Sequence, residues 1–343
     1  MASSPNVASP ASPFPSFAGA DEALVIEGFI KKMPKAELHV HLEGTLEPGL
    51  VRKFAERNKV DVPDAQSPHD ALSVLLKEED FYDLTYAYLT KCKKENVVIT
   101  EMFFDPQAHT GRGVPFPVVI EGIKRAITKG KRELSVQASL IMCFLQDESP
   151  EWAMATLMES LPHRKYITGV GLDSEERTNP PIKFAKVFER ATKEGYMTTA
   201  HCDIDQKDSI EQIQQALEVL KVDRINHGTN ILEDEKLIKH VKENGIGLTT
   251  CPISNDAISS DHKGKEIKKL LKTGVLVTCN SDDPATGGYM TDNMLRLWDD
   301  GKGLSKEELL QLQVNAFHAS WSPTDTQNYW LGQLEDYRWQ AIG

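Results

Sequence analysis

Short apolar runs alternate along the chain with longer segments whose apolar and polar positions follow a helical period. Eight runs have the length and composition of strands, and they cover residues 36–42, 97–104, 135–145, 167–172, 197–201, 224–227, 245–250 and 274–279. Amphipathic segments around them predict helices over residues 48–58, 78–94, 117–131, 183–194, 208–222, 233–244 and 306–317.

This alternation predicts an α/β fold. Strands separated by helical segments pair in parallel through right-handed crossovers, and eight such units fit a closed (β/α)₈ TIM barrel. An open doubly wound sheet is the alternative. Residues 1–20 carry no charged side chain and are rich in Ala, Ser and Pro, which predicts a disordered tail. Since this tail lacks the basic start and apolar stretch of a secretory signal, we expect one catalytic domain over residues 21–343.

The charge and the cysteines of the chain argue against several kinds of binding partner and protein class. The 343 residues include 39 Lys+Arg and 51 Asp+Glu, a net charge of −12. This argues against proteins that bind nucleic acid or anionic membranes by charge, and no apolar run is long enough to span a bilayer. The five cysteines form no CxxC pair, which argues against zinc ribbons and cytidine-type deaminases and indicates reduced thiols. We expect a cytoplasmic protein, with the nucleus as the alternative compartment.

Candidate chemistry lies where four of the predicted strands end, which is where TIM barrels carry their active sites. The first strand ends with His39 and His41, the fifth with His201, the sixth with His227, and the eighth runs into Asp282 and Asp283. Each feature alone has an ordinary reading as a surface histidine or a helix cap. Together, imidazole nitrogens and one carboxylate suit Zn²⁺ with a position open for water, which ionises to a hydroxide nucleophile. A further imidazole then takes or steers the proton.

Longer motifs give a family resemblance. PKAELHVHLEGTLEP (residues 34–48), RINHG (224–228) and CNSDDP (279–284) resemble, in this order, motifs of the adenosine/adenine deaminase family of the amidohydrolase superfamily. FFDPQAHTGRGV (103–114) and VGLDSEERTNPP (170–181) are similar to the adenine deaminase branch. The resemblance implies zinc-dependent hydrolytic deamination at C6 of a 6-aminopurine, adenine or a close analogue, with release of ammonia. It also implies a small-molecule purine as the partner, and the net charge favours the free base over a nucleotide.

The resemblance also implies a role for each motif residue. The ligands of one Zn²⁺ per chain would be His39, His41, His201 and Asp282. His227 would orient and deprotonate the metal-bound water, and Asp283 would bond purine N7. Glu176, with Ser174 beside it, would meet the N3/N9 edge of the base, and Glu43 either lines the base pocket or only turns the chain. Residues 169–174 contain no lysine that would bridge a second metal.

One departure from the family pattern concerns the proton donor. The family has His-Ala-Gly-Glu after the fifth strand, and that Glu protonates purine N1. Here the stretch from His201 reads HCDID, so Ile204 occupies the place of a group worth roughly 10²–10⁴-fold in rate. Asp203 or Asp205 could supply the proton through a rearranged loop. Alternatively the substrate is a cytokinin-like N6-alkyl adenine, or adenosine or a nucleotide, or the protein is a catalytically weak purine- and metal-binding relative.

Other positions near the strand ends have less certain roles. Gln146, after the third strand, stands where adenine deaminases are expected to carry an arginine, and this also bears on the substrate. His109 and Arg112 follow the second strand, where a solvated loop is favoured over a lid. Asn255 either closes the site from the seventh strand or caps the next helix.

Overall fold

The computed structural model describes residues 20–62, 71–176, 179–202, 208–298 and 303–342. Almost all of the predicted tail therefore lies outside the described residues. The same is true of Asp203, Ile204 and Asp205, so the proposed substitutes for the missing glutamate are not among the described side chains.

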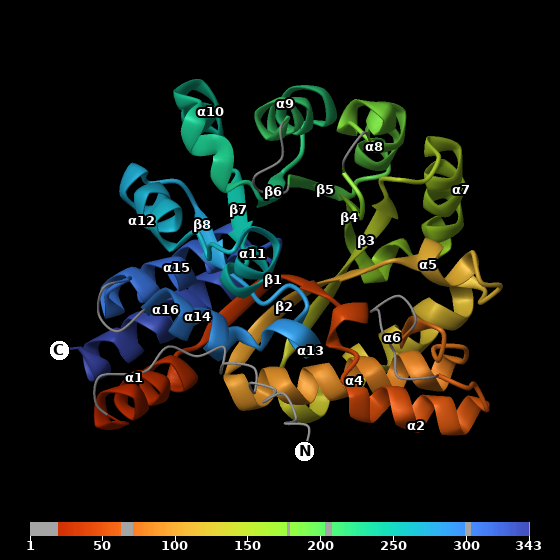
Figure 1. Cartoon of the computed structure of the whole chain (residues 1–343), viewed down its shortest axis with the longest axis horizontal. Coiled ribbons are helices and arrows are strands. Elements are labelled where there is room, and N and C mark those ends of the chain that lie inside the picture. Colours follow the sequence, from red (N-terminus) through yellow and green to blue (C-terminus); the bar gives the residue numbers. More distant parts are fainter. Residues whose placement is uncertain (1–19, 63–70, 177–178, 203–207, 299–302, 343) are drawn as a thin grey trace, which may run out of the picture.

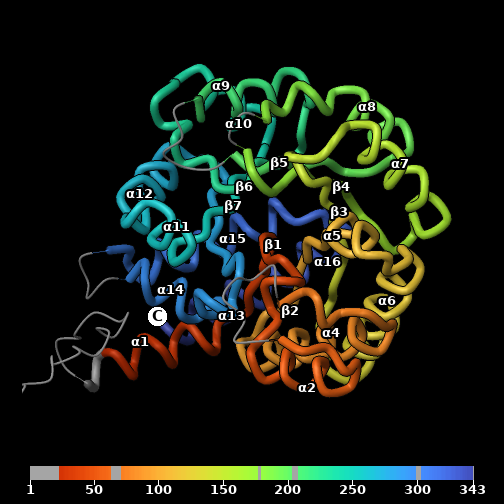
Figure 2. The backbone as a smooth tube through the Cα atoms, turned by 45° about the vertical axis from the view of Figure 1, so that its right-hand side comes forward, coloured from red at the N-terminus to blue at the C-terminus, as the bar shows by residue number. Residues whose placement is uncertain are grey.

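Eight parallel strands are arranged in chain order from β1 to β8, and helices surround them (Figures 1 and 2). The strands are β1 (Lys35–His41), β2 (Val97–Phe104), β3 (Gln137–Leu145), β4 (Ile167–Asp173), β5 (Met197–Cys202), β6 (Arg224–His227), β7 (Gly247–Thr250) and β8 (Val277–Cys279). A parallel bridge between Val40 of β1 and Asp282 after β8 brings the first and last strands together. This confirms the predicted TIM barrel and excludes the open doubly wound sheet.

The helices connect successive strands and cover the barrel. They are α1 (Ala20–Lys32), α2 (Pro48–Asn58), α4 (Glu78–Glu95), α5 (Pro106–Thr110), α6 (Phe116–Leu134), α7 (Pro150–Ser160), α8 (Ala185–Lys193), α9 (Ser209–Gln215), α10 (Glu235–Glu243), α11 (Pro252–Ser259), α12 (Gly264–Thr273), α13 (Pro284–Gly287), α14 (Met290–Trp298), α15 (Lys306–Ala319) and α16 (Thr324–Ala341). The sequence analysis did not predict α1, α7, α14 or α16. In α1, α7 and α16 the apolar side chains are not confined to one stripe. Proline at the first turn of α2, α6 and α7 suits a helix start.

A buried ion pair closes the amino-terminal end of the barrel. Arg224, the first residue of β6, places Nη1 2.6 Å from Oε2 of Glu101 in β2, and both side chains are buried. The backbone N–H of Trp321 donates to the other Glu101 oxygen at 2.5 Å, and its ring lies 4.1 Å from the guanidinium. Gly169 of β4 leaves room for this ring, since a Cβ there would lie 2.4 Å from it.

The barrel interior above this ion pair is filled with side chains. Phe103, Ile141 and Cys143 are fully buried and pack with Trp321. As in other TIM barrels, the interior is a packed core and not a pore. A ligand therefore reaches the interior polar groups from the carboxyl ends of the strands.

The structure also bears on the predictions of reduced thiols and of no membrane-spanning segment. All five cysteines are buried and carry free thiols. Among the described residues, no helix combines the length and the apolar character needed to cross a bilayer.

Candidate active site

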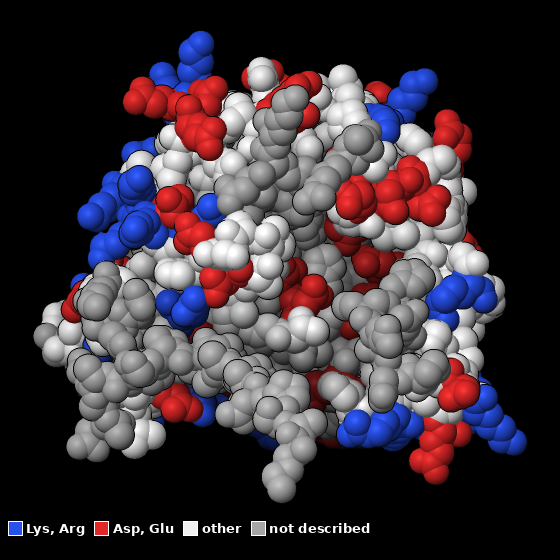
Figure 3. Space-filling model, viewed as in Figure 1, with Lys and Arg blue, Asp and Glu red and all other residues white. Residues whose placement is uncertain are grey.

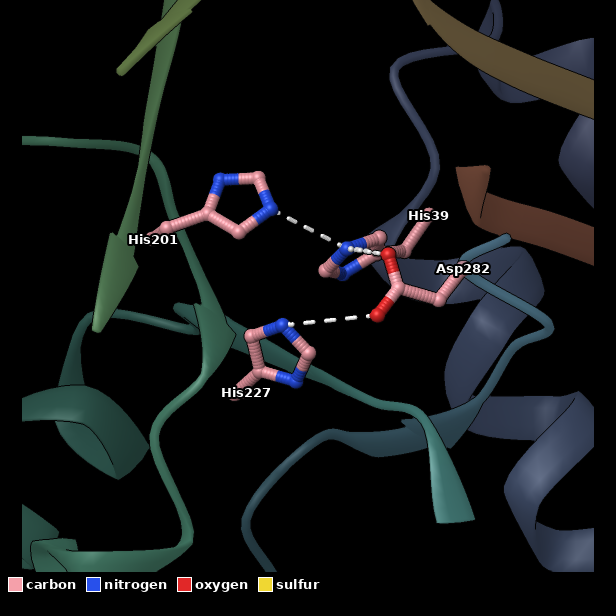
Figure 4. A group of neighbouring side chains, drawn as sticks. All are labelled: His39, His201, His227 and Asp282. Carbon is pink, nitrogen blue, oxygen red and sulfur yellow. Dashed lines mark hydrogen bonds and ion pairs between the residues drawn. The ribbon is translucent and has the colours of Figure 1, made fainter. Parts of the chain in front are cut away.

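Four histidines and one aspartate meet at the carboxyl ends of β1, β5, β6 and β8. Figure 4 shows His39, His201, His227 and Asp282. The Nε2 atom of His201 lies 3.2 Å from Nε2 of His39 and 3.2 Å from Nε2 of His41. Oδ1 of Asp282 lies 3.2 Å from His39 Nε2 and 3.5 Å from His41 Nε2. The structure thus brings together the four atoms that the sequence suggested as metal ligands.

These spacings fit a tetrahedral metal site. Ligands at 2.0–2.1 Å from a zinc ion, at tetrahedral angles, lie roughly 3.3 Å from one another. His227 is placed differently, because its Nε2 is 3.8 Å from Oδ2, the second oxygen of Asp282. Its imidazole faces the site beside the four suggested ligands, where it can bond a water molecule.

The other ring nitrogen of each suggested histidine ligand faces an oxygen atom. Nδ1 of His39 is 2.9 Å from the hydroxyl of Thr249, and Nδ1 of His201 is 3.0 Å from the carbonyl oxygen of Leu172. Nδ1 of His41 is 3.5 Å from a carboxylate oxygen of Asp173. When these nitrogens donate to their oxygens, each Nε2 keeps its lone pair for a metal ion.

The backbone is strained where β6 and β8 deliver their side chains. His227 has φ +57° and Asp282 has φ +65°, both in the left-handed region that residues other than glycine rarely adopt. Such conformations persist where the surrounding structure holds them, and they concentrate at functional sites. At this end of the barrel they turn the imidazole and the carboxylate toward the ligand cluster.

The protonation states suit metal binding for three of the four suggested ligands. Burial lowers the pKa of His39 to about 4, and burial and the neighbouring histidines hold the pKa of His201 well below its usual range. Burial opposes ionisation of Asp282, but His39 and the other histidines hold its pKa well below the usual range. For His41, burial lowers the pKa and the carboxylates of Asp283 and Asp282 raise it, with a net increase. A metal ion therefore competes with a proton at His41.

Two further aspartates, which the sequence reasoning missed, lie at the same end of the barrel. Asp105 follows β2 and Asp173 ends β4, and both approach His41. Burial and the neighbouring carboxylates raise the pKa of Asp105 to about 6 and that of Asp173 well above its usual range. One buried oxygen of each carboxyl has no hydrogen-bond partner among the described residues. Both aspartates sit at strand ends, as the histidines do, but a lone aspartate there is also common in turns, so its position alone did not mark it as a site residue.

Asp283 and Glu43 extend this acidic group from the loops after β8 and β1. The carboxyl of Asp283 lies so close to Gly44 that a Cβ there would be 1.8 Å from Oδ1. Burial and the neighbouring Asp282 raise the pKa of Asp283 to about 6. Burial opposes ionisation of Glu43, but His109 and the backbone N–H groups that bond the carboxylate together outweigh burial and lower its pKa. Acidic side chains gather around a hollow near the middle of this face (Figure 3).

The remaining predicted positions are found in different surroundings. Glu176 is buried in the segment after β4, whereas the side chain of Ser174 is exposed and its φ is +79°. Gln146 is buried, and its amide donates to the carbonyl oxygen of Asn179. His109 corrects the expectation of a solvated loop, because its side chain is fully buried.

Asn255 lies inside α11 and not at its cap. It is fully buried, and neither polar atom of its side chain has a hydrogen-bond partner among the described residues. The capping interpretation is therefore wrong, and the amide is free to meet a ligand.

The chain is similar to known proteins over nearly its whole length. The family model described as adenosine deaminase matches residues 34–71 and 69–337. An uncharacterized deaminase of Schizosaccharomyces pombe is 46% identical, with 91% of this chain and 98% of that protein covered. An adenine deaminase of Acinetobacter baylyi is 43% identical, with 89% and 97% covered. The crystal structure of an adenine deaminase from Arthrobacter aurescens has 33% identity and a TM-score of 0.84, and covers 89% of this chain and 99% of that one.

Proposed function

Because the chain belongs to the adenosine deaminase family, we propose that it is a metal-dependent hydrolase that converts adenine and water to hypoxanthine and ammonia. Relatives named adenine deaminases, 43% identical over most of the chain, support this substrate. The observation that carries the proposal is the set of four ligand atoms, 3.2–3.5 Å apart, at the carboxyl end of the barrel. We further propose that residues 21–343 form one catalytic domain.

The proposed metal ion is a single Zn²⁺. It would be held by His39, His41, His201 and Asp282, whose nitrogen and oxygen atoms have the spacing and chemistry that zinc prefers. When bound, the ion supplies a water molecule that ionises near neutral pH, and this is the nucleophile that C6 of the purine requires. The lack of a lysine in residues 169–174 supports one ion per chain.

His227 is the proposed general base. Its Nε2 faces the second oxygen of Asp282, so the ring stands beside the proposed ligands, where it would bond a water molecule held by the ion. The left-handed backbone at His227 fixes that direction. The ring takes the proton of the water and can return it to the departing ammonia, since general acids and bases work in both directions.

The purine is held by carboxyl groups in this proposal. Asp283, whose pKa is raised to about 6, is partly protonated near neutral pH and can donate a hydrogen bond to N7. We assign contacts with the N3/N9 edge to Glu176 and Ser174, on the segment after β4. The proton for N1 is assigned to Asp203 or Asp205, because the isoleucine at 204 has none to give.

The experiment that tests this function is a substrate panel. Zinc-loaded protein is incubated with adenine, adenosine, AMP and N6-alkyl adenines, and released ammonia or alkylamine is measured. We expect adenine to be the best substrate and AMP the poorest, since the carboxylates around the site repel a phosphate group. Absence of release from every member of the panel would overturn the proposal. Release from N6-alkyl adenines alone would instead identify the substituted base as the substrate.

The substitution Ile204→Glu tests whether catalysis was weakened by the loss of the family glutamate. If Asp203 or Asp205 already donates the proton, the added carboxyl brings little gain in adenine turnover. A gain of a hundredfold or more would show that the wild-type chain lacks a working N1 donor, as expected of a weak relative that mainly binds purine and metal.

A further inference from the structure

Side chains hold part of the seam at which β1 and β8 close the barrel. The backbone N–H of Leu38 in β1 donates to Oδ1 of Asn280, the residue after β8, at 2.8 Å. In the other direction, the backbone N–H and the hydroxyl of Ser281 both donate to Oε1 of Glu37 in β1, the N–H at 3.2 Å. Two side chains thus join the strands beside their backbone bridge.

The carboxyl of Glu37 is buried, and each of its oxygens has a donor. Oε1 accepts from Ser281, and Oε2 accepts from the hydroxyl of Tyr88 in α4 at 2.5 Å. The same hydroxyl lies 2.8 Å from that of Thr100 in β2. A buried carboxyl costs free energy unless donors compensate it, so an apolar residue would suit this position better if Glu37 only filled space. The contribution of Glu37 therefore lies in the hydrogen bonds that it accepts.

A bulge in β1 separates Glu37 from the histidines that follow it. The register between β1 and β2 shifts after Glu37, which leaves β1 with one residue more than β2 before Val40. In a regular strand every second side chain shares a face, so Glu37 would point the same way as His39 and His41. The bulge instead lets the carboxyl meet α4 outside the barrel while both histidines face the interior. Glu37 therefore reaches the site only through the chain that follows β8.

Asp282 directly follows the residue that Glu37 holds. Its backbone N–H donates to the carbonyl oxygen of His39 at 3.1 Å, and its own carbonyl oxygen accepts from the N–H of His41 at 3.0 Å. Its φ of +65° is a conformation that persists only where the surrounding structure maintains it. In this conformation Oδ1 faces His39 and His41, while Oδ2 faces His227. The two oxygens of one carboxylate are thus held in separate places.

We propose that Glu37 and Ser281 are positioning residues that orient the carboxylate of Asp282, with one oxygen toward the metal ion and the other toward His227. This inference rests on the metal site of the proposed function and concerns residues that the substrate does not touch. Without the bonds between Glu37 and Ser281, the strained backbone at Asp282 relaxes and its carboxylate turns away from the histidines. Tyr88 supports this arrangement from α4 by holding the second oxygen of Glu37.

The test measures the Kd for Zn²⁺ of metal-stripped protein by competition with a chromophoric chelator. In Ser281→Ala the Kd should rise roughly tenfold to a hundredfold, as expected when a group that orients a metal ligand is removed. Ser160→Ala is the matched control, because Ser160 in α7 also has a buried hydroxyl in a side-chain hydrogen bond, 2.8 Å from that of Tyr196. The control should stay within twofold of the wild type. A Kd for Ser281→Ala within threefold of the wild type would overturn the inference.

Variants of Glu37 separate orientation of the ligand from support of the fold. Glu37→Gln keeps an acceptor for Ser281 and should raise the Kd for Zn²⁺ less than threefold, while Glu37→Ala should raise it at least as much as Ser281→Ala. Equal losses in the Gln and Ala variants would contradict the positioning role. If Glu37→Ala does not fold, Ser281→Ala and its control still decide the proposal. Exposed histidines can bind further zinc weakly, so His318→Ala, at an exposed histidine on α15, is a second control and should leave the Kd unchanged.

Cobalt gives a readout of the geometry that does not depend on turnover. Co²⁺ in place of zinc absorbs visible light more strongly in a tetrahedral site than in an octahedral one, so the spectrum reports how the ligands are arranged. We expect a changed spectrum in Ser281→Ala and the wild-type spectrum in Ser160→Ala. A Ser281→Ala spectrum identical to that of the wild type would overturn the inference. Failure of the proposed function would look different, since the wild type would then bind no zinc, or bind it and release no ammonia from adenine.

Discussion

The two ends of the barrel both bury charged side chains, but they do so in opposite ways. At the amino-terminal end, Arg224 and Glu101 carry opposite charges 2.6 Å apart, and the ring of Trp321 covers the guanidinium. At the carboxyl end, Asp105 and Asp173 lie near each other, and burial and the repulsion between their ionised forms raise the pKa of each.

The difference shows which end serves stability and which serves function. A buried pair of opposite charges is compensated within the protein, and removing one partner leaves the other uncompensated. Crowded carboxyl groups with partnerless oxygens destabilise the protein unless a cation or a ligand compensates them. The carboxyl end is thus arranged for an ion and a substrate. At the amino-terminal end the two opposite charges compensate each other, although Nε and Nη2 of Arg224 have no hydrogen-bond partner among the described residues.

The largest effect is expected at the carboxyl end, in turnover and not in stability. His227→Ala removes the proposed base and should lower kcat for adenine by about 10²–10⁴-fold, with a midpoint of thermal unfolding close to that of the wild type. Steady-state kinetics and thermal unfolding measure the two quantities. His318→Ala is the matched control and should leave kcat unchanged. Turnover by His227→Ala within threefold of the wild type would contradict the assignment.

At the amino-terminal end we expect a variant to lose stability and to keep its turnover. Glu101→Ala leaves the guanidinium of Arg224 buried without its carboxylate, and should lower the free energy of unfolding by about 3–5 kcal/mol. The kcat of the folded fraction should stay within a few-fold of the wild type. Urea unfolding gives the stability, and Glu101→Gln, which keeps an acceptor, should lose less. If the free energy of unfolding of Glu101→Ala fell by less than about 1 kcal/mol, the ion pair would not be needed for stability.

In metal-stripped protein, Asp105→Asn should change the free energy of unfolding by a smaller amount that depends on pH. The pKa of Asp105 is raised from 3.8 to about 6, so ionising it costs native stability, and this cost grows as pH rises from about 4 to above 6. The variant should therefore be more stable than the wild type, by about 1 kcal/mol at pH 4.5 and about 3 kcal/mol at pH 7.5. Urea unfolding at both values checks this. The exposed Asp147→Asn is the control, and a pH-independent difference for Asp105→Asn would refute the charge argument.

The smallest effect is expected where an ion pair lies at the surface. Glu189 and Lys193 of α8 are 2.5 Å apart, and both are well exposed. Because solvent screens such pairs, Glu189→Ala should change the free energy of unfolding by no more than about 0.5 kcal/mol. Urea unfolding of Glu189→Ala and Glu101→Ala, measured together, shows how strongly burial determines the contribution of an ion pair to stability. Equal losses in the two variants would remove the distinction between buried and exposed pairs.

The fold and the ligand cluster were predictable from sequence because both follow from short-range patterns. Each predicted strand begins and ends within three residues of the observed strand, and the histidines were found because they sit at strand ends. Asp105 and Asp173 sit there too, but a lone aspartate at a strand end is as common in turns, so only their shared distance to His41 identifies them.

The surroundings of His109 could not be predicted in this way. Its burial depends on Phe81 and Glu43, which come from other parts of the chain, and no local pattern reports such contacts. The same holds for Gln146, whose amide is bonded to Asn179 33 residues away. The burial and hydrogen-bond partners of such side chains depend on residues far along the chain, so local sequence patterns could not predict them.

The most direct test of the central claim is a zinc titration of metal-stripped protein with adenine as the substrate. The account predicts that stripped protein releases no ammonia and that activity rises linearly with added zinc up to one equivalent per chain. In Asp282→Asn, which alters a proposed ligand, the same titration should restore little activity. Full turnover of adenine by protein shown to contain no metal would contradict the account.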